Sequence, residues 1–315
     1  PADTGALAKK TRKAVKTVGA LGTIDDGRID TKMIAWKFAL PPNFPKACVS
    51  QAEELPLTIS GDEHRHRKDL RTVPFVTIDG EDAKDFDDAV ALDEDGSLWV
   101  AVADVAHFVR QGTALDDEAA RRGNSFYFPD SVIPMLPEKI SNFLCSLRPD
   151  EDKLCMAVRI RVDDAGDVSY DPPLEGVMRS KARLTYEAVD RFFSTGESLR
   201  APEGVEAMLS AIRPVVQRMF RRRMEQGGVD FDLSEVKFDL DARGRVSGIK
   251  KRVRTAAQGL IEELMLAANR SVASYMLEAK IPSVYRVHDF PDETAVQDFV
   301  RFVRALGWEV DAIDP

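Results

Sequence analysis

Residues 73–92 read Val-Pro-Phe-Val-Thr-Ile-Asp-Gly-Glu-Asp-Ala-Lys-Asp-Phe-Asp-Asp-Ala-Val-Ala-Leu, so that acidic side chains stand between two apolar segments. The apolar segments, 73–78 and 89–92, are typical of buried strands. Six carboxylates lie in the ten positions between them: Asp79, Glu81, Asp82, Asp85, Asp87 and Asp88. So much like charge beside buried strands is costly unless a counter-ion neutralises it. A hard divalent cation, which takes oxygen ligands, meets this need, and the stretch therefore predicts a metal site.

Four of the six carboxylates are the candidate ligands: Asp79, Asp85, Asp87 and Asp88. Asp79 closes the first strand, and a turn at the adjacent Asp87 and Asp88 brings both side chains toward one cation. We expect the remaining two, in mid-loop, to be exposed. Such a set can hold one or two divalent ions that ligate a phosphate and lower the pKa of an attacking water. A structural calcium loop and a sugar-phosphate enzyme remain alternatives here, although the segment lacks the helix–loop–helix calcium pattern.

The bulk composition permits this interpretation without selecting it. The chain has 315 residues, 44% of them hydrophobic and 31% charged, which is ordinary for a globular protein of about two domains. No run of about 18 apolar residues and no signal-peptide pattern occur, so we expect a cytoplasmic protein without a membrane partner. Three cysteines at no metal-ligand spacing predict reduced thiols. The net charge of −9 argues against a protein that coats nucleic acid, and we expect a monomer.

Four basic runs interrupt this acidic average, at 9–16, 64–68, 218–223 and 250–254. Each run alone is typical of a solvated face. Together, beside one carboxylate cluster, they favour a polyanionic substrate whose phosphate is the point of chemistry.

Aromatic side chains near basic residues are the second signal of a nucleic-acid partner. Tyr127 lies between two phenylalanines after a basic pair, and Phe231 follows the glycine pair at 227–228. Exposed aromatics of this kind stack single-stranded bases, at about 1–3 kcal/mol per base. A Phe or Tyr before proline is more often a core residue, so both interpretations stay open at this stage.

Helices and strands are mixed without a regular βαβ alternation, which predicts the α+β class. We expect a first module at 1–49, with a helix over 4–19, a hairpin over 22–30 around Asp26-Gly27, and a linker at 40–45. Helix and hairpin together resemble the tail of a winged-helix module. The second domain, 50–315, is expected to contain strands at 72–78, 86–93, 97–107 and 155–162, helices at 114–122, from 185, 203–225, 256–279 and 292–306, and paired strands at 236–240 and 245–253. The helix at 203–225 is expected to start afresh or to be kinked at Pro214.

Residues 71–89 also resemble the signature of the RNase II / RNase R family of exoribonucleases, whose catalytic unit is the RNB domain. Further motifs continue the resemblance in order, at 102–107, 121–130, 133–141, 144–147, 182–186, 260–269 and 285–289. The resemblance covers about residues 65–310. It implies the RNB catalytic fold, a mixed sheet flanked by helices. It also implies processive 3′→5′ hydrolysis of single-stranded RNA to nucleoside 5′-monophosphates, with Mg²⁺ or Mn²⁺.

The resemblance further implies roles for individual residues. Asp79, Asp85, Asp87 and Asp88 match the four aspartates of the family; among them Asp79 and Asp88 would be metal ligands, and Asp87 the residue whose loss stops cleavage. Tyr127 matches the aromatic that stacks at the 3′ end, and Phe231 matches its partner. Tyr186 and Glu263 occupy the positions that contact ribose hydroxyls, which allows such a site to prefer RNA to DNA.

Several parts of the family pattern are absent from this sequence. The motif Ser-Pro-Ile-Arg-Arg-Tyr with its catalytic arginine, a later glutamate, and the flanking OB-type domains are missing. We therefore expect a chain that is truncated within the catalytic domain. Two alternatives remain: a non-catalytic RNA-binding member of the family, which should have lost one of the four aspartates, and a metal-dependent exonuclease of single-stranded DNA.

Overall fold

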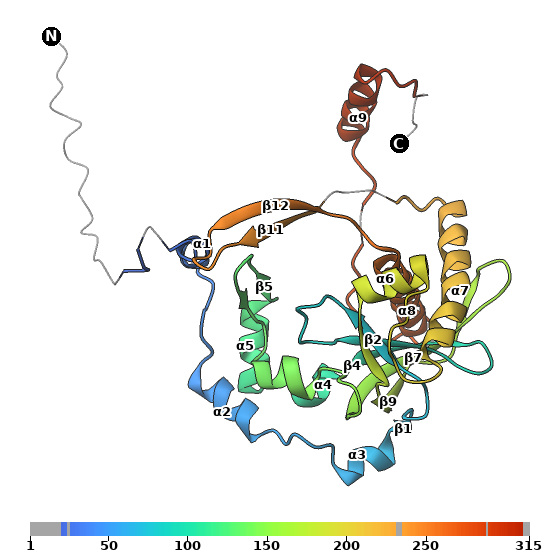
Figure 1. The fold of residues 1–315 in the computed structure, drawn as a ribbon, viewed down its shortest axis with the longest axis horizontal. Coiled ribbons are helices and arrows are strands. Elements are labelled where there is room, and N and C mark those ends of the chain that lie inside the picture. The colour runs from blue at the N-terminus through green and yellow to red at the C-terminus, as the bar shows by residue number, and fades with distance from the viewer. Residues whose placement is uncertain (1–19, 24–25, 231–234, 288, 311–315) are drawn as a thin grey trace. The chain divides into compact units, whose positions relative to one another are not determined.

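The computed structural model describes residues 20–23, 26–230, 235–287 and 289–310 (Figure 1). The chain divides into two compact units, Pro1–Asn269 and Arg270–Pro315. The first unit contains the main sheet and the acidic stretch, and the second contains helix α9 (Glu293–Ala305). No helix in the described ranges is both long enough and apolar enough to cross a membrane.

A mixed eight-stranded sheet forms the centre of the first unit. Its strands are β1 (Lys68–Asp69), β2 (Val76–Asp79), β3 (Asp88–Leu92), β4 (Leu98–Ala103), β7 (Asp152–Val162), β8 (Val168–Tyr170), β9 (Leu174–Arg179) and β10 (Ala182–Thr185). The strand order is β1-β9-β7-β4-β3-β2-β10, with β8 beside β7. The outer pairs β1–β9 and β2–β10 are parallel, and the other pairs are antiparallel. The predicted α+β class is therefore confirmed, as are strands at the predicted places of β2, β3, β4 and β7. The strand predicted at 97–107 ends at Ala103, because residues 105–108 form a short helix, and β9 and β10 were not predicted.

Helices complete one continuous core around this sheet. They are α1 (Ile29–Lys37), α2 (Lys46–Glu54), α3 (Gly61–His66), α4 (Val105–Phe108), α5 (Ala114–Arg122), a π-helix η2 (Lys139–Leu144), α6 (Tyr186–Thr195), α7 (Val205–Glu225) and α8 (Ala256–Glu278). Buried side chains from α2, α5, α6, α7 and the first half of α8 join those of the central strands. On α8 the side chains of Leu260, Ile261, Leu264 and Ala268 are buried in this core, whereas Val272 and Met276 are only half-buried.

Helix α7 is one helix that runs through Pro214, so the predicted fresh start at this proline is wrong. Its apolar face is buried on both sides of the proline, at Leu209 and Val216, and this packing compensates for the hydrogen bond that proline cannot donate. The helix ends at Glu225, as the predicted range 203–225 has it, and the glycine pair at 227–228 follows. Gly227 is left-handed, with φ 90°, and the Gly228 N–H donates to the Arg223 carbonyl oxygen at 2.9 Å.

The N-terminal part differs from the prediction. Residues 29–37 form helix α1 where the second strand of a hairpin was expected. A two-residue hairpin turn requires left-handed backbone, which Gly27 does not adopt, and the Asp26 carboxylate instead accepts the Arg28 N–H at 3.1 Å. The predicted helix at 4–19 lies outside the described residues. The expected boundary at 49–50 falls inside α2, and the division into two modules stays a prediction.

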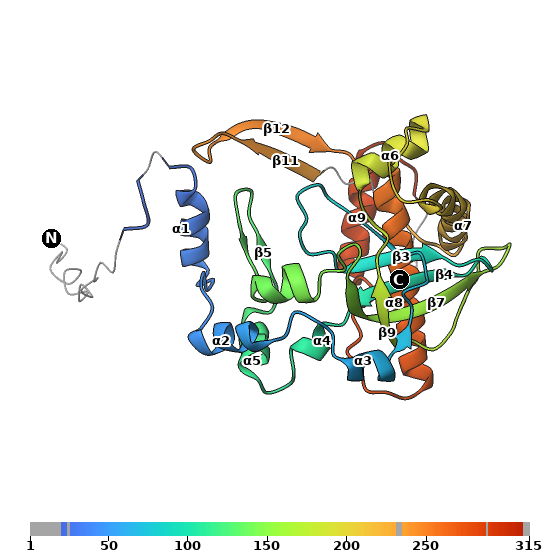
Figure 2. The ribbon, with the colours of Figure 1, turned by 60° about the horizontal axis from the view of Figure 1, so that its bottom comes forward.

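A long hairpin, β11 (Glu235–Leu240) with β12 (Val246–Arg252), forms as predicted and arches from the body of the unit to α1 (Figures 1 and 2). At its tip the Gly27 N–H donates to the Arg243 carbonyl oxygen at 3.0 Å. A Cβ atom on Gly27 would lie 2.4 Å from the Gly244 carbonyl oxygen, so this approach requires glycine. We call the contact between Gly27 and the 243–244 turn the clasp.

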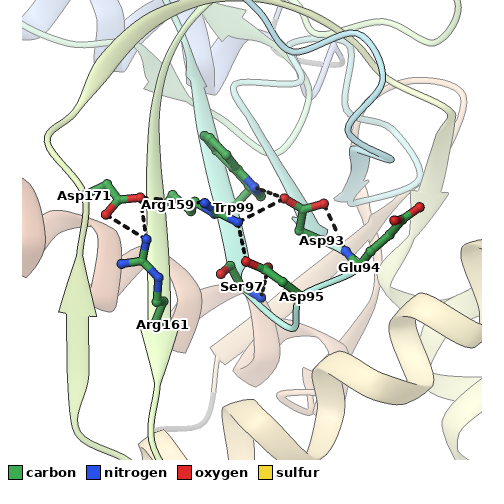
Figure 3. Close-up of polar contacts among 8 residues, drawn as sticks. All are labelled: Asp93, Glu94, Asp95, Ser97, Trp99, Arg159, Arg161 and Asp171. Atoms are coloured by element: carbon green, nitrogen blue, oxygen red, sulfur yellow. Dashed lines mark hydrogen bonds and ion pairs between the residues drawn. The ribbon is translucent and has the colours of Figure 1, made fainter.

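The turn between β3 and β4 lies at the end of these strands remote from Asp88, and it is also acidic. Arg159 of β7 donates to Asp93 at 3.4 Å and to Asp95 at 2.5 Å, and the Trp99 indole N–H donates to Asp93 (Figure 3). Arg161 pairs in the same way with Asp171 across β7 and β8. Arginines therefore pair with most of the carboxylates at this end of the sheet and offset part of the negative charge.

We expect Gly27→Ala to open the clasp, because the new Cβ atom would collide with backbone and not with a flexible side chain. Amide hydrogen exchange in the turn at 241–245 should become at least tenfold faster, while exchange in β4 stays unchanged. Gly80→Ala is the matched control, because nothing lies within 4 Å of a Cβ atom there. Equal protection of the turn in both variants would contradict the clasp.

Candidate functional site

The acidic stretch lies at one edge of the main sheet. Strand β2 ends at Asp79 and β3, antiparallel to it, begins at Asp88, so the two carboxylates lie at the same edge. The parallel strand β10 places Thr185 opposite Asp79 in register. The loop 80–87 joins the two strands, and Asp85 and Asp87 lie at its end. The four predicted aspartates are thus brought to one edge, by two strands and the loop between them.

Ser146 holds the second half of this loop. Its hydroxyl is fully buried, accepts the Phe86 N–H at 3.1 Å and donates to the Lys84 carbonyl oxygen at 2.9 Å. The next residue, Leu147, donates its N–H to the Phe86 carbonyl oxygen at 2.9 Å. Three hydrogen bonds therefore fix the backbone on either side of Asp85.

Arg183 of β10 holds the first half of the loop. Its Nη2 donates to the carbonyl oxygens of Gly80 and Glu81, at 2.8 and 2.6 Å, and its guanidinium lies 5.6 Å from the centre of the Phe86 ring. Its Nε is buried and has no hydrogen-bond partner within the described part of the chain. Sequence reasoning did not assign a role to Arg183, although a single cation inside an otherwise apolar strand was a usable signal.

The carboxylates destabilise one another's ionised forms. Burial, followed by the charge of Asp88, raises the pKa of Asp79 to about 7, against the opposing effect of Arg183. Burial and the charge of Asp87 raise the pKa of Asp88 to about 6. Burial and Asp85 also raise the pKa of Asp87. Unlike the turn at the other end of β3, this edge holds negative charge that the protein does not neutralise.

These residues fit a divalent cation by their chemistry. The donors are hard carboxylate oxygens, and the Oδ2 atom of Asp79 is buried with no hydrogen-bond partner among the described residues. As the side chains stand, no group of three or more His, Cys, Asp or Glu residues in the described ranges is arranged to hold an ion. The predicted metal ligands therefore stay a prediction, supported by charge and burial.

A buried ion pair lies behind the site. The Ala103 N–H donates to the Asp87 carbonyl oxygen at 2.9 Å, and the adjacent Asp104 accepts from Nη2 of Arg67 at 2.7 Å. Arg67 also donates to Glu63 at 2.7 Å, and its side chain is only 5% exposed. Arg67 is thus a structural cation, although its basic run was expected to face a polyanion.

Members of the other basic runs are also engaged within the protein. The ion pairs are Arg222–Asp167, Arg223–Glu263, Arg254–Asp230 and Lys250–Asp239, all between 2.7 and 2.8 Å. The run at 9–16 lies outside the described residues. Fewer of the basic side chains are therefore free to bind a polyanion than the four basic runs in the sequence indicate.

The structure places three of the four predicted RNA-contacting residues. Tyr127 of β5 (Phe126–Tyr127) is 71% exposed, and partial burial of its hydroxyl together with the charges of Asp85 and Asp87 raises its pKa. Tyr186 begins α6 directly after Thr185 and so lies next to Asp79. Glu263 is instead buried on α8, where it accepts hydrogen bonds from Nε and Nη2 of Arg223. The fourth, Phe231, lies outside the described residues.

Comparisons with known proteins agree with this fold and identify a family. Residues 67–314 match the RNB domain family. Ribonuclease R of Vibrio parahaemolyticus is 39% identical over 300 residues, which are 94% of this chain and 36% of that protein. Ribonuclease R of Aquifex aeolicus is 38% identical over 308 residues, 96% of this chain and 44% of that protein. The chain therefore spans about two fifths of the length of these relatives.

Solved structures show the same architecture. Mycoplasma genitalium RNase R in complex with ribose-methylated single-stranded RNA matches with a TM-score of 0.89 and 30% identity, over 93% of this chain and 46% of that one. The yeast protein Ssd1, a pseudonuclease, matches with a TM-score of 0.63 and 18% identity, over 82% and 32% of the two chains. The second likeness shows a shared fold alone.

The raised pKa values predict how stability depends on pH when no divalent cation is present. The native protein holds protons on Asp79 and Asp88 up to about pH 7 and 6, whereas the unfolded chain loses them near pH 4. The native state thus binds more protons in this window, so stability should fall as the pH rises from 4 to 7. Over this range the two groups together are worth several kcal/mol, so in EDTA the thermal midpoint should fall by on the order of 10 °C. Asp79→Asn should flatten the dependence, and an equally steep profile in this variant would contradict the assignment.

Arg183→Met should loosen the acidic loop, because it removes two charged hydrogen bonds and keeps only an apolar chain in place of the aliphatic part of the side chain. We expect a loss of about 2 kcal/mol in the free energy of unfolding, with faster amide exchange at 80–86. Arg179→Met, which removes an exposed ion pair with Asp152, is the control and should cost less than about 1 kcal/mol. The assignment of Arg183 fails if the two variants behave alike in denaturant titrations.

Proposed function

The chain belongs to the RNB domain family, and from this membership we propose that it forms part of a nuclease that hydrolyses single-stranded RNA in the 3′→5′ direction, releasing nucleoside 5′-monophosphates processively. The observation that carries the proposal is the un-neutralised carboxylate edge at Asp79, Asp87 and Asp88. Carboxylates whose pKa values are raised by burial and by each other are typical of sites that work on charged substrates through a cation. The named relatives, which are ribonucleases, support the same chemistry.

We assign the cofactor as Mg²⁺, with Mn²⁺ as a substitute, held by Asp79, Asp85, Asp87 and Asp88. When bound, such an ion neutralises the clustered charge, lowers the pKa of an attacking water and stabilises the leaving oxygen of a phosphodiester. The protein supplies the rest of the arrangement. Arg183 and Ser146 hold the two halves of the loop, so the carboxylates keep their positions while the substrate changes.

Recognition of the RNA end falls to residues around this edge. Tyr127 offers an exposed ring beside Asp85, where the terminal base can stack, and Phe231 is the proposed second ring. Tyr186 lies next to Asp79, where it can contact a ribose hydroxyl; Glu263, whose carboxylate is held by Arg223, is proposed for the same role. A contact with the 2′-hydroxyl would make the site prefer RNA to DNA of the same sequence.

We expect Asp87→Asn to abolish RNA hydrolysis in the full-length protein while RNA binding stays within about threefold of the wild type. The substitution removes a charge at the site but not the residues proposed to hold the base and ribose. The assay is cleavage of a labelled oligoribonucleotide with Mg²⁺ or EDTA, together with filter binding. Asp82→Asn, in the exposed middle of the loop, is the control and should retain activity.

The same assay separates the alternatives. Hydrolysis by Asp87→Asn at the wild-type rate would remove the proposed mechanism. Equal cleavage of a matched single-stranded DNA would assign a DNA exonuclease instead. RNA binding without cleavage by the wild-type protein would assign a non-catalytic member of the family, the class to which the pseudonuclease of the same fold belongs by its name.

A further inference from the structure

A pocket outside the carboxylate edge opens between α6, α7 and the start of α8. Its volume is about 480 Å³, within the range of about 300–1,000 Å³ that small-molecule sites occupy. Its aromatic and charged lining residues are Phe193, Arg213, Phe220, Arg221, Asp230 and Arg254. Among the described residues, neither the four aspartates nor Tyr127, Tyr186 and Glu263 belong to its lining.

The lining carries three arginines against one aspartate, but the arginines are not equivalent. Arg254 is engaged by Asp230 and Glu262, each at 2.7 Å. Arg213 gives one Nη1–H to the Phe193 carbonyl oxygen at 3.0 Å, which leaves further donors on the guanidinium. Arg221 is exposed and has no carboxylate partner within the described ranges, although both following arginines have one. Two guanidinium groups with spare donors at one pocket suit a phosphate.

The same pocket offers aromatic walls. Phe193 and Phe220 line it, and each ring already has a cation near it: Arg213 lies 5.0 Å from the Phe193 centroid, and Arg223 lies 5.3 Å from that of Phe220. Aromatic rings beside arginines are the combination on which single-stranded nucleic-acid sites stack bases. An aliphatic ligand would not need the arginines, and an inorganic anion would not need the rings.

Helix α6 connects the pocket to the carboxylate edge. It begins at Tyr186, next to Asp79, and Phe193 lies seven residues later, which corresponds to about 10 Å along the helix axis. A strand held at the aspartates can therefore reach the pocket within a few nucleotides.

We propose that this pocket binds one nucleotide, with the base between Phe193 and Phe220 and the phosphate on Arg213 and Arg221. The nucleotide comes either from the RNA strand or from free 5′-monophosphate, because both present the same base and phosphate. The proposal rests on the proposed function, since it takes the substrate to be RNA.

The test is photo-crosslinking of the full-length Asp87→Asn protein to a labelled oligoribonucleotide that carries 5-iodouridine, with mapping of the crosslinked peptides. We expect crosslinks at Phe193 or Phe220 in addition to those near Tyr127. Arg221→Gln should reduce the pocket crosslinks about tenfold and leave those near Tyr127 unchanged. Because Arg221 is exposed and forms no ion pair with any described carboxylate, its loss should not affect folding. Arg191→Gln, an equal charge change on an exposed residue of α6, is the control and should change neither crosslink.

An excess of uridine 5′-monophosphate separates the two sources of the nucleotide. If uridine 5′-monophosphate removes only the crosslinks at Phe193 or Phe220, the pocket is a site for the free nucleotide. If those crosslinks persist, the pocket is a site for the RNA strand. Both results support the proposal. Crosslinks confined to the Tyr127 region, or pocket crosslinks that survive Arg221→Gln, overturn it while leaving the proposed function intact. Absence of every crosslink overturns the proposed function itself.

Discussion

Repulsion between carboxylates at the ends of β2 and β3 is the constraint around which this unit is built. Strand β3 is flanked by acidic residues at both of its ends, by Asp87 and Asp88 at one and by Asp93 to Asp95 at the other. At one edge Arg159 takes up the negative charge, whereas at the other the aspartates raise one another's pKa values. An un-neutralised edge lowers the stability of the protein without a cation, and that loss is recovered when positive charge arrives. The fold therefore reserves one end of the sheet for a ligand.

The backbone of the loop 80–87 must be held in place by groups that do not neutralise the carboxylates of Asp79, Asp87 and Asp88. Arg183 binds the carbonyl oxygens of the loop, not its carboxylates, and Ser146 does the same with an uncharged hydroxyl. Arg67 is buried and charged, but it pairs with Asp104, which follows Ala103 in the chain and is not one of the four aspartates. Its positive charge is therefore taken up by another carboxylate. Arg183 and Ser146 thus fix the backbone of the loop, and Arg183 offsets only part of the charge of the carboxylates, so the site is preorganised and still negative.

The sequence predicts those parts of the site that follow from runs of apolar and acidic residues within a short segment. The apolar runs around Asp79 and Asp88 indicate two strands and a loop, and the structure has them. Contacts between distant residues escape such reasoning. Strand β10 is only four residues long and owes its place to pairing with β2 about a hundred residues earlier. The local pattern could therefore mark Arg183 as unusual, but it could not show that Arg183 holds the loop 80–87. The Asp26-Gly27 dipeptide reads locally as a hairpin, and its contact with a turn more than 200 residues away gives it another geometry.

The clasp has a consequence for how the protein is made. Gly27 leaves the ribosome about 200 residues before its partner turn at 243–244, an interval of about 10–40 s at typical rates of synthesis. The N-terminal segment must therefore wait, without its final contacts, until most of the unit has been synthesised. β2 waits in the same way for β10, which leaves one edge of the nascent sheet open to other chains. During that interval the charge of the acidic loop has a second use, since repulsion between nascent chains opposes their aggregation.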